Sequence, residues 1–246
     1  MTNPPVANFS NDLSQPVGAP LPDWTTRPQP YEQAMSGRYC RVEPITPAHA
    51  EQLFAANSDD VEGRNWTYLF SEPPADLEDY RSWVRKMSVS KDPLMHAIVS
   101  LDSGTAVGVA SFMRIEPGHG VIEVGNINFS PRLQRTRAST EAMFLMMKRA
   151  FDELGYRRYE WKCDSLNAPS RAAALRYGFQ FEGIFRQAVV YKQRSRDTAW
   201  FSITDGEWPA IRSAFEHWLA ADNFDAAGRQ RQSLGVWMSH VRSSIR

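Results

Sequence analysis

A turn rich in arginine and hydroxyl residues, "SPRLQRTRASTEA" at positions 130–142, carries the residue types that bind phosphate groups. Arg135 and Arg137 supply guanidinium groups, whose charge-assisted hydrogen bonds to phosphate are among the strongest in proteins. The turn leads directly into a segment with helical periodicity. A helix N-terminus offers unpaired N–H groups and the positive end of the helix dipole, so it attracts anions. Hydroxyl groups of the same turn could add to this site: Thr136, Ser139 and Thr140.

The phosphate site has an alternative that the sequence leaves open. The turn contains no glycine, which phosphate-binding loops often use so that the backbone can approach the anion. An ordinary solvated helix cap would contain the same polar residues. The P-loop pattern, the glycine-rich dinucleotide pattern and the G-x-S-x-G turn do not occur. The five histidines lack ligand spacing, so no metal site is expected.

The composition limits the classes of protein to which the chain can belong. Its 246 residues, 42% of them hydrophobic, can bury one substantial core. Lys+Arg and Asp+Glu both number 28, and this zero net charge argues against a nucleic-acid partner. The first residues do not resemble a secretory signal, and no apolar run reaches the roughly 18 residues of a membrane span. We therefore expect a cytoplasmic protein without a membrane partner, with Cys40 and Cys163 as buried thiols.

The hydrophobic periodicities predict an α/β fold, with a twisted mixed sheet of about seven strands and helices on both of its faces. Period-two patterns predict strands within residues 37–45, 94–101, 106–115, 120–129, 157–163, 180–192 and 197–204. Periods near 3.6 predict helices within residues 46–57, 76–90, 143–154, 167–177 and 208–219.

The chain is expected to divide into an arm, a folded domain and a tail. Residues 1–36 contain seven prolines and little periodicity, which predicts an extended arm that contacts the domain through Trp24 and Tyr31. Residues 37–220 hold all the predicted strands and helices. Residues 221–246 are polar and basic and are expected to form a tail, whose arginines are more typical of a solvated surface than of an RNA contact.

Several short motifs follow one another in the second half of the chain. "QRTRAS" at 134–139 precedes "TEA", and "NAPS" at 167–170 is followed by "GF" at 178–179 and "EG" at 182–183. Their order and spacing resemble the GNAT acyltransferase superfamily, and most of all its branch of ribosomal-protein N-terminal acetyltransferases. In that family a Q/R-x-x-G-x-G/A turn holds the pyrophosphate of acetyl-CoA. This chain departs from that pattern, because Arg137 and Ser139 replace the two small residues.

The resemblance implies acetyl-CoA as co-substrate and no metal. We expect the turn to bind the diphosphate, with guanidinium groups compensating for the missing glycines. Backbone groups of the preceding strand would pair with the pantetheine arm, which Asn167 would help to position. The expected cofactor-binding residues are Ile127, Asn128, Phe129, Gln134, Arg135, Thr136, Arg137, Ala138, Ser139, Thr140, Asn167 and Ser170.

Acyl transfer to an amine needs a base for the amine, a polarised thioester and a proton for the leaving thiolate. The family reacts by direct attack, so no Cys or Ser nucleophile is expected. Glu123 is the candidate base, with a surface carboxylate as the alternative and with Asp164 and Asp197 in reserve. Ser170 is the candidate proton donor, and helix capping is its alternative. Many family members use a tyrosine at a position that is Ala174 here.

The acceptor site is expected in "GRNWTYLF" at 63–70, between the first two helices, a region that lines the acceptor cleft in the family. Trp66 and Tyr68 could contact the amine, although aromatic residues more often fill a core. Asp164 completes the predicted acceptor-binding set. These residues favour an N-acetyltransferase, and the alternative is a catalytically weak module that binds CoA or a protein partner. The identity of the amine and a homodimeric state stay open.

Overall fold

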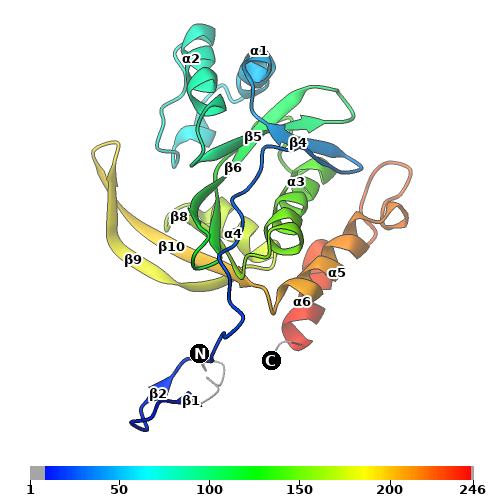
Figure 1. Cartoon of the computed structure of the whole chain (residues 1–246). Helices are drawn as coiled ribbons and strands as arrows, with labels where there is room; N and C mark the ends of the chain where they lie inside the picture. Colours follow the sequence, from blue (N-terminus) through cyan, green and yellow to red (C-terminus); the bar gives the residue numbers. More distant parts are fainter. Residues whose placement is uncertain (1–8, 245–246) are drawn as a thin grey trace.

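A computed structural model describes residues 9–244, without the side chains of 240 and 242–244. Residues 1–8 of the expected arm and 245–246 of the expected tail lie outside this range. Figure 1 shows one central sheet with helices packed around it. The strands are β1 Phe9–Ser10, β2 Pro16–Val17, β3 Met35–Ser36, β4 Cys40–Pro44, β5 Leu94–Ser100, β6 Ala106–Glu116, β7 Val121–Phe129, β8 Arg158–Asp164, β9 Gln180–Tyr191 and β10 Arg194–Thr204. The helices are α1 Ala50–Asn57, α2 Leu77–Ser88, α3 Arg137–Lys148, α4 Ala168–Arg176, α5 Trp208–Leu219 and α6 Leu234–Ser244.

The central sheet confirms the predicted α/β fold. Its strand order is β3-β4-β5-β6-β7-β8-β10-β9, and all neighbours are antiparallel except β7 and β8. The sheet has eight strands instead of about seven, because the two-residue β3 pairs with β4 through Met35 and Val42. A separate small hairpin, β1 and β2, projects at the bottom of Figure 1. In the central sheet, the parallel pair β7–β8 has further strands on both sides.

The two faces of the sheet bury two separate hydrophobic clusters. On β5, Met95 and Ala97 face the cluster covered by α1 and α2, whereas Leu94 and Ile98 face the larger cluster. Helices α3, α5 and α6 contribute to that larger cluster. Successive strand residues point to opposite faces, so a strand covered on both sides must be apolar throughout. This explains why β5 reads as an almost continuous apolar run.

The N-terminal arm contacts the domain as predicted. Trp24 donates its indole N–H to the carbonyl of Gly118 at 2.9 Å, and Tyr31 donates its hydroxyl to Glu153. The arm is also tied to the domain by Tyr156, whose hydroxyl donates to the carbonyl of Pro28 at 3.1 Å. Long-range contacts therefore hold a segment that has almost no regular structure of its own.

The C-terminal segment corrects the expectation of a polar tail. Residues 234–244 form helix α6, and its Leu234, Met238 and Val241 are buried in the larger cluster beside α5. Phe224, in the connection before α6, also belongs to that cluster. The apolar positions 234, 238 and 241 follow helical spacing, but the surrounding arginines and serines hide the pattern. No helix in residues 9–244 is long and apolar enough to cross a membrane.

Candidate active site

The parallel pair β7–β8 opens into a cavity. Its ladder runs from Val121 opposite Arg158 to Val124 opposite Trp161 and ends there. A bulge follows in β7, because the register with β6 shifts after Gly125 and Asn126 has a φ of 50°. Glycine inside a strand often marks such a bulge. Bulges bend a strand away from its neighbour, so residues 125–129 separate from β8 and leave a cavity of about 270 Å³.

A larger groove, of about 1330 Å³, continues from the cavity across the turn before α3. The two spaces share seven lining residues, so they form one passage. The shared residues are Asn65, Tyr68, Phe129, Gln134, Asn167, Ala173 and Tyr177. The passage therefore connects the open edge of β7 with the N-terminus of α3.

The turn before α3 presents backbone N–H groups to the groove. Thr136 is the N-cap, and its hydroxyl oxygen accepts the N–H of Ser139 at 3.1 Å. Arg135 has a φ of 61°, the left-handed region that non-glycine residues avoid. Such strain costs about 1–3 kcal/mol and is typically found at functional sites. The N–H groups of Arg137 and Ala138, in the first helical turn, have no carbonyl within the helix to bond.

The hydroxyl groups expected to add to the phosphate site form hydrogen bonds within the protein. Thr136 donates its hydroxyl to the carbonyl of Leu133, and Ser139 donates to the carbonyl of Thr136. The hydroxyl oxygen of Thr140 accepts from Arg176 at 3.0 Å. These groups fix the shape of the turn, which leaves backbone N–H groups and arginines as the donors that can reach a ligand.

The three arginines of the turn differ in their partners. Arg132 makes two hydrogen bonds to the Asp59 carboxylate, at 2.7 and 3.1 Å. Arg135 is exposed and lines the groove. The Arg137 guanidinium lies over the rings of Tyr39 and Phe224, at 4.5 and 5.1 Å. Arg135 and Arg137 therefore remain the cations of the turn that can meet an anion.

The opened edge of β7 fits an extended co-substrate such as acetyl-CoA. The side-chain oxygen of Asn128 is buried and lines the cavity, and nothing in residues 9–244 donates a hydrogen bond to it. Buried polar atoms without partners are rare in proteins, so this oxygen suits an N–H donor of a ligand. Ile127 and Phe129 line the same cavity. Gln134 was expected among the cofactor-binding residues, but its side chain donates to the carbonyl of Phe129 at 2.8 Å.

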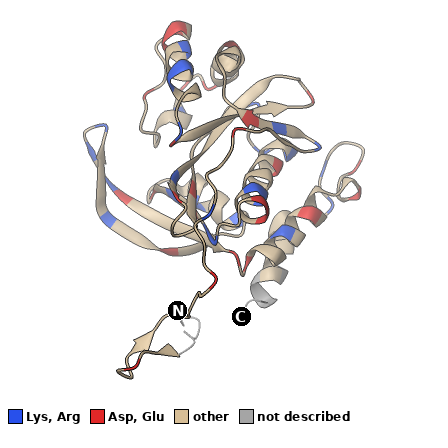
Figure 2. Cartoon of the chain, viewed as in Figure 1, with Lys and Arg blue, Asp and Glu red and all other residues tan. Residues whose placement is uncertain are grey.

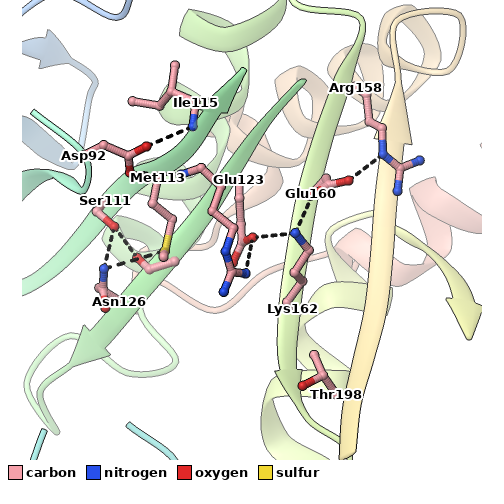
Figure 3. A network of polar contacts seen from close by, with 12 residues as sticks. Asp92, Ser111, Met113, Ile115, Glu123, Asn126, Arg158, Glu160, Lys162 and Thr198 are labelled. Atoms are coloured by element: carbon pink, nitrogen blue, oxygen red, sulfur yellow. Dashed lines mark hydrogen bonds and ion pairs between the residues drawn. The ribbon is translucent and has the colours of Figure 1, made fainter. Parts of the chain in front are cut away.

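The candidate base Glu123 is part of a chain of ion pairs across the sheet, and Figure 3 shows the chain continuing to Glu160 and Arg158. Glu123 is 3% exposed and lines the cavity. Its Oε2 accepts from Arg114 and from Lys162, both at 2.8 Å. Lys162 also contacts Glu160 at 2.6 Å. Glu123 is therefore not a surface carboxylate, and only its Oε1 is left for a proton from the cavity.

The candidate donor Ser170 lies on the opposite wall of the cavity. Its hydroxyl oxygen accepts the indole N–H of Trp161 at 3.0 Å. Asn167 caps α4 by accepting the Ser170 N–H with its side-chain oxygen at 3.1 Å, so the capping role considered for Ser170 belongs to Asn167. Cys163 lines the same wall, and burial raises the pKa of its thiol. A neutral thiol is a poor nucleophile.

The residues expected to bind the acceptor are not all in the cavity. Tyr68 and Asp164 line it. Trp66 does not, because it is 9% exposed and packs in the cluster under α1 and α2, as aromatic core filling would predict. The reserve base Asp197 is also absent from the cavity lining, and its carboxylate accepts the N–H of Gln187 at 2.7 Å. Asp164 accepts the Tyr191 hydroxyl at 2.8 Å.

Sequence reasoning missed three charged residues of this region. Lys162 pairs with Glu123, and Arg196 lines the cavity while being 7% exposed. Glu141, read only as part of a motif, accepts the N–H groups of residues 38–40 with its carboxylate at 2.6 to 2.9 Å. A charged residue inside a strand of buried residues, as in "YEWKC", was the available signal for Lys162.

Comparisons with known proteins agree with this geometry. The family model of the acetyltransferase (GNAT) domain matches residues 40–180. The chain belongs to the GNAT family. GNAT domains use acetyl-CoA as their co-substrate. None of the curated proteins matches the chain.

Solved GNAT structures resemble the chain over most of its length. A GCN5-related N-acetyltransferase from Brucella melitensis is 49% identical with a TM-score of 0.87, covering 89% of this chain and 100% of its own. A probable GNAT acetyltransferase from Chromobacterium violaceum is 41% identical with a TM-score of 0.74, covering 85% and 100%. An acetyl transferase from Salmonella typhimurium, which modifies the N-terminal serine of ribosomal protein L7/L12, shares the fold at 19% identity, a TM-score of 0.61 and coverage of 70% and 99%.

Proposed function

We propose that this GNAT protein is an N-acetyltransferase that moves the acetyl group of acetyl-CoA to a primary amine. The observation that carries the proposal is the continuous passage from the N-terminus of α3 to the opening between β7 and β8. A long co-substrate with a diphosphate and a distant reactive group suits such a passage. Acetyl-CoA, when bound, supplies an acetyl group activated as a thioester.

The residues of the passage divide the work of binding. The first turn of α3 offers N–H groups and positive charge, and Arg135 adds a guanidinium at the groove. The edge of β7 beyond Val124 has lost β8 as its partner, so its N–H and C=O groups can hold an extended arm. Asn128 offers a buried acceptor for a hydrogen bond. Together these groups would fix the co-substrate with its reactive end in the cavity.

The proton steps are assigned to the two cavity walls. Glu123 takes a proton from the amine through Oε1, directly or through water, as the N–C bond forms. The C–S bond breaks, and the Ser170 hydroxyl gives its proton to the leaving sulfur and regains one from solvent. The proton lost by the amine balances the proton gained by the thiol. Burial raises the pKa of the Cys163 thiol, which disfavours an acyl-protein and favours direct attack by the amine.

A second candidate is a CoA-binding module without turnover. It is favoured by Ala174, which is fully buried and cannot donate a proton, and by Arg137, whose guanidinium is held on two rings. Such a module would keep the groove and lose the chemistry. It would still bind CoA through the same turn, so binding alone does not separate the two candidates.

Two measurements test the proposal. Native mass spectrometry of the purified protein should detect a bound CoA species. Thiol release from acetyl-CoA should then depend on an added primary amine, with the acetylated amine identified by mass. Bound CoA without amine-dependent thiol release would favour the binding module. If neither bound CoA nor amine-dependent thiol release is found, both candidates are refuted. The cytoplasmic location and a homodimeric state stay predictions for fractionation and light scattering.

A further inference from the structure

One cation of the cavity has no carboxylate partner. Arg196 of β10 is 7% exposed, and no carboxylate in residues 9–244 lies within 4.0 Å of its guanidinium. Its Nε donates to the hydroxyl oxygen of Thr198 at 3.2 Å. The rings of Phe70 and Tyr191 lie 5.2 and 5.8 Å from its central carbon. Aromatic faces attract a guanidinium, but they do not replace the hydrogen bonds that it loses on leaving water.

Two other cations that are buried in the described part of the chain are paired. Lys162 is held between Glu123 and Glu160. Arg149 contacts Glu153 at 2.7 Å and donates to the carbonyl of Gln33 at 2.9 Å. A buried charge without a partner is costly, and proteins normally pair it. Arg196 is therefore the exception among these three, and it lines the cavity.

The carboxylate of Asp164, which lines the same cavity, already has hydrogen-bond partners. Asp164 lines the cavity with Arg196, but its carboxylate accepts the Tyr191 hydroxyl at 2.8 Å and the N–H of Leu166 at 2.9 Å. The charges of Asp164 and Arg196 act in opposite directions on Tyr191, whose pKa burial raises to about 12. Asp164 thus balances Arg196 only from a distance, and the guanidinium can still accept an anionic partner.

We propose that Arg196 binds a carboxylate of the acceptor, so that the substrate is an amine that also carries a carboxylate. This inference rests on the proposed function and adds the chemical class of the acceptor. A planar guanidinium matches a carboxylate through two parallel hydrogen bonds. The walls formed by Tyr68 and Phe70 would enclose the chain between the amine and the carboxylate. The carboxylate belongs to a free amino acid or to an acidic residue behind a peptide N-terminus.

The test uses matched pairs of acceptors that differ only in charge. Free amino acids are compared with their primary amides, and short peptides with Asp or Glu at the second position are compared with the same peptides carrying Asn or Gln. We expect kcat/KM to be about 10- to 100-fold higher for the carboxylate member of the preferred pair. Whichever pair shows the preference identifies the source of the carboxylate.

Variants locate the preference at Arg196. Arg196→Gln should remove the difference in kcat/KM within the pair, through KM of the carboxylate member, and keep CoA affinity. Arg196→Lys keeps the charge and should restore part of the preference. Arg194→Gln removes an exposed arginine of the same strand and should change nothing. Melting temperatures of all variants check that the fold is intact.

Several outcomes would overturn the proposal. Equal rates for carboxylate and amide in every pair, or a preference that survives in Arg196→Gln, would refute it. A preference for amines that carry phosphate would refute the carboxylate assignment. If the protein shows no turnover at all, the proposed function fails, but calorimetry of the same pairs with the CoA-loaded protein still decides this inference. Tighter binding of the carboxylate member to the wild type than to Arg196→Gln would support it.

Discussion

The turn before α3 contains three arginines, and the wall of the cavity contains arginine, lysine and carboxylate side chains, but the two regions use their charges differently. In the cavity wall, Glu123 and Lys162 are buried and paired with each other. In the turn, Arg135 is exposed and lines the groove, while Arg137 lies on aromatic rings. In Figure 2 both signs of charge are interspersed along the ribbon of the whole domain.

The comparison teaches that the partner of a charge, not its presence, indicates its role. A cation paired inside the protein is already satisfied and contributes to the fold, although breaking the pair is expensive. A cation without a carboxylate near a groove gains most from an external anion. By this criterion the turn is the place for the diphosphate, and Arg196 is the one residue of the cavity that behaves like the turn.

The largest effect is expected from removing both candidate cations of the turn. Arg135→Ala combined with Arg137→Ala should weaken CoA binding by about 10²- to 10⁴-fold, because each contact to a charged phosphate contributes about 1.5–3 kcal/mol. Calorimetry gives the dissociation constants. Arg186→Ala, at an exposed arginine of β9, is the control and should bind like the wild type. An unchanged constant in the double variant would remove the turn from the binding site.

The next largest effect is expected from removing the carboxylate of Glu123, which is paired in the cavity wall. Glu123→Gln keeps the size of the side chain but cannot take a proton, so the rate should fall by about 10²-fold. The same change leaves Lys162 with Glu160 alone and should lower the free energy of unfolding by about 3 kcal/mol. Stopped-assay kinetics and chemical denaturation measure the two effects separately. A loss of stability with the full rate would make Glu123 a structural residue only.

A smaller effect is expected from removing the Ser170 hydroxyl. Ser170→Ala should lower kcat by about 10-fold or more while CoA affinity changes little, because the hydroxyl acts on the leaving sulfur. The variant also frees the indole N–H of Trp161, which intrinsic fluorescence can follow. Ser165→Ala is the nearby control. Wild-type kinetics in Ser170→Ala would mean that solvent alone protonates the sulfur.

The smallest effect is expected from the paired arginine of the turn. Arg132 lines the same groove as Arg135, but both of its hydrogen bonds to Asp59 are already made. Arg132→Ala should therefore change the CoA dissociation constant by no more than about fivefold. A loss as large as that of the double variant would show that pairing does not distinguish the arginines, and the comparison between the two regions would fail.

The sequence determined the element order because periodicity is a local property. Seven of the eight strands of the central sheet and the helix over 208–219 follow from patterns within single segments. The position of the turn at the N-terminus of α3 follows as well, since Thr136 is a good N-cap and the apolar positions after it are regular. Tyr68 and Asp164, which were expected to bind the acceptor, line the cavity, whereas Trp66 was not distinguishable from a core residue.

Which charged and polar side chains already have partners inside the protein follows only from the three-dimensional fold. Glu123 and Lys162 lie 39 positions apart by their numbers, yet they meet because β7 and β8 are neighbours in the sheet. The burial of α6 likewise depends on α5, which covers its few apolar residues. Hydrogen bonds and ion pairs act over about 3 Å in space, so their partners cannot be read from spacing along the chain. For that reason the sequence identified several residues of the passage, but only the fold shows that Arg196 lines it with no carboxylate of residues 9–244 within 4.0 Å.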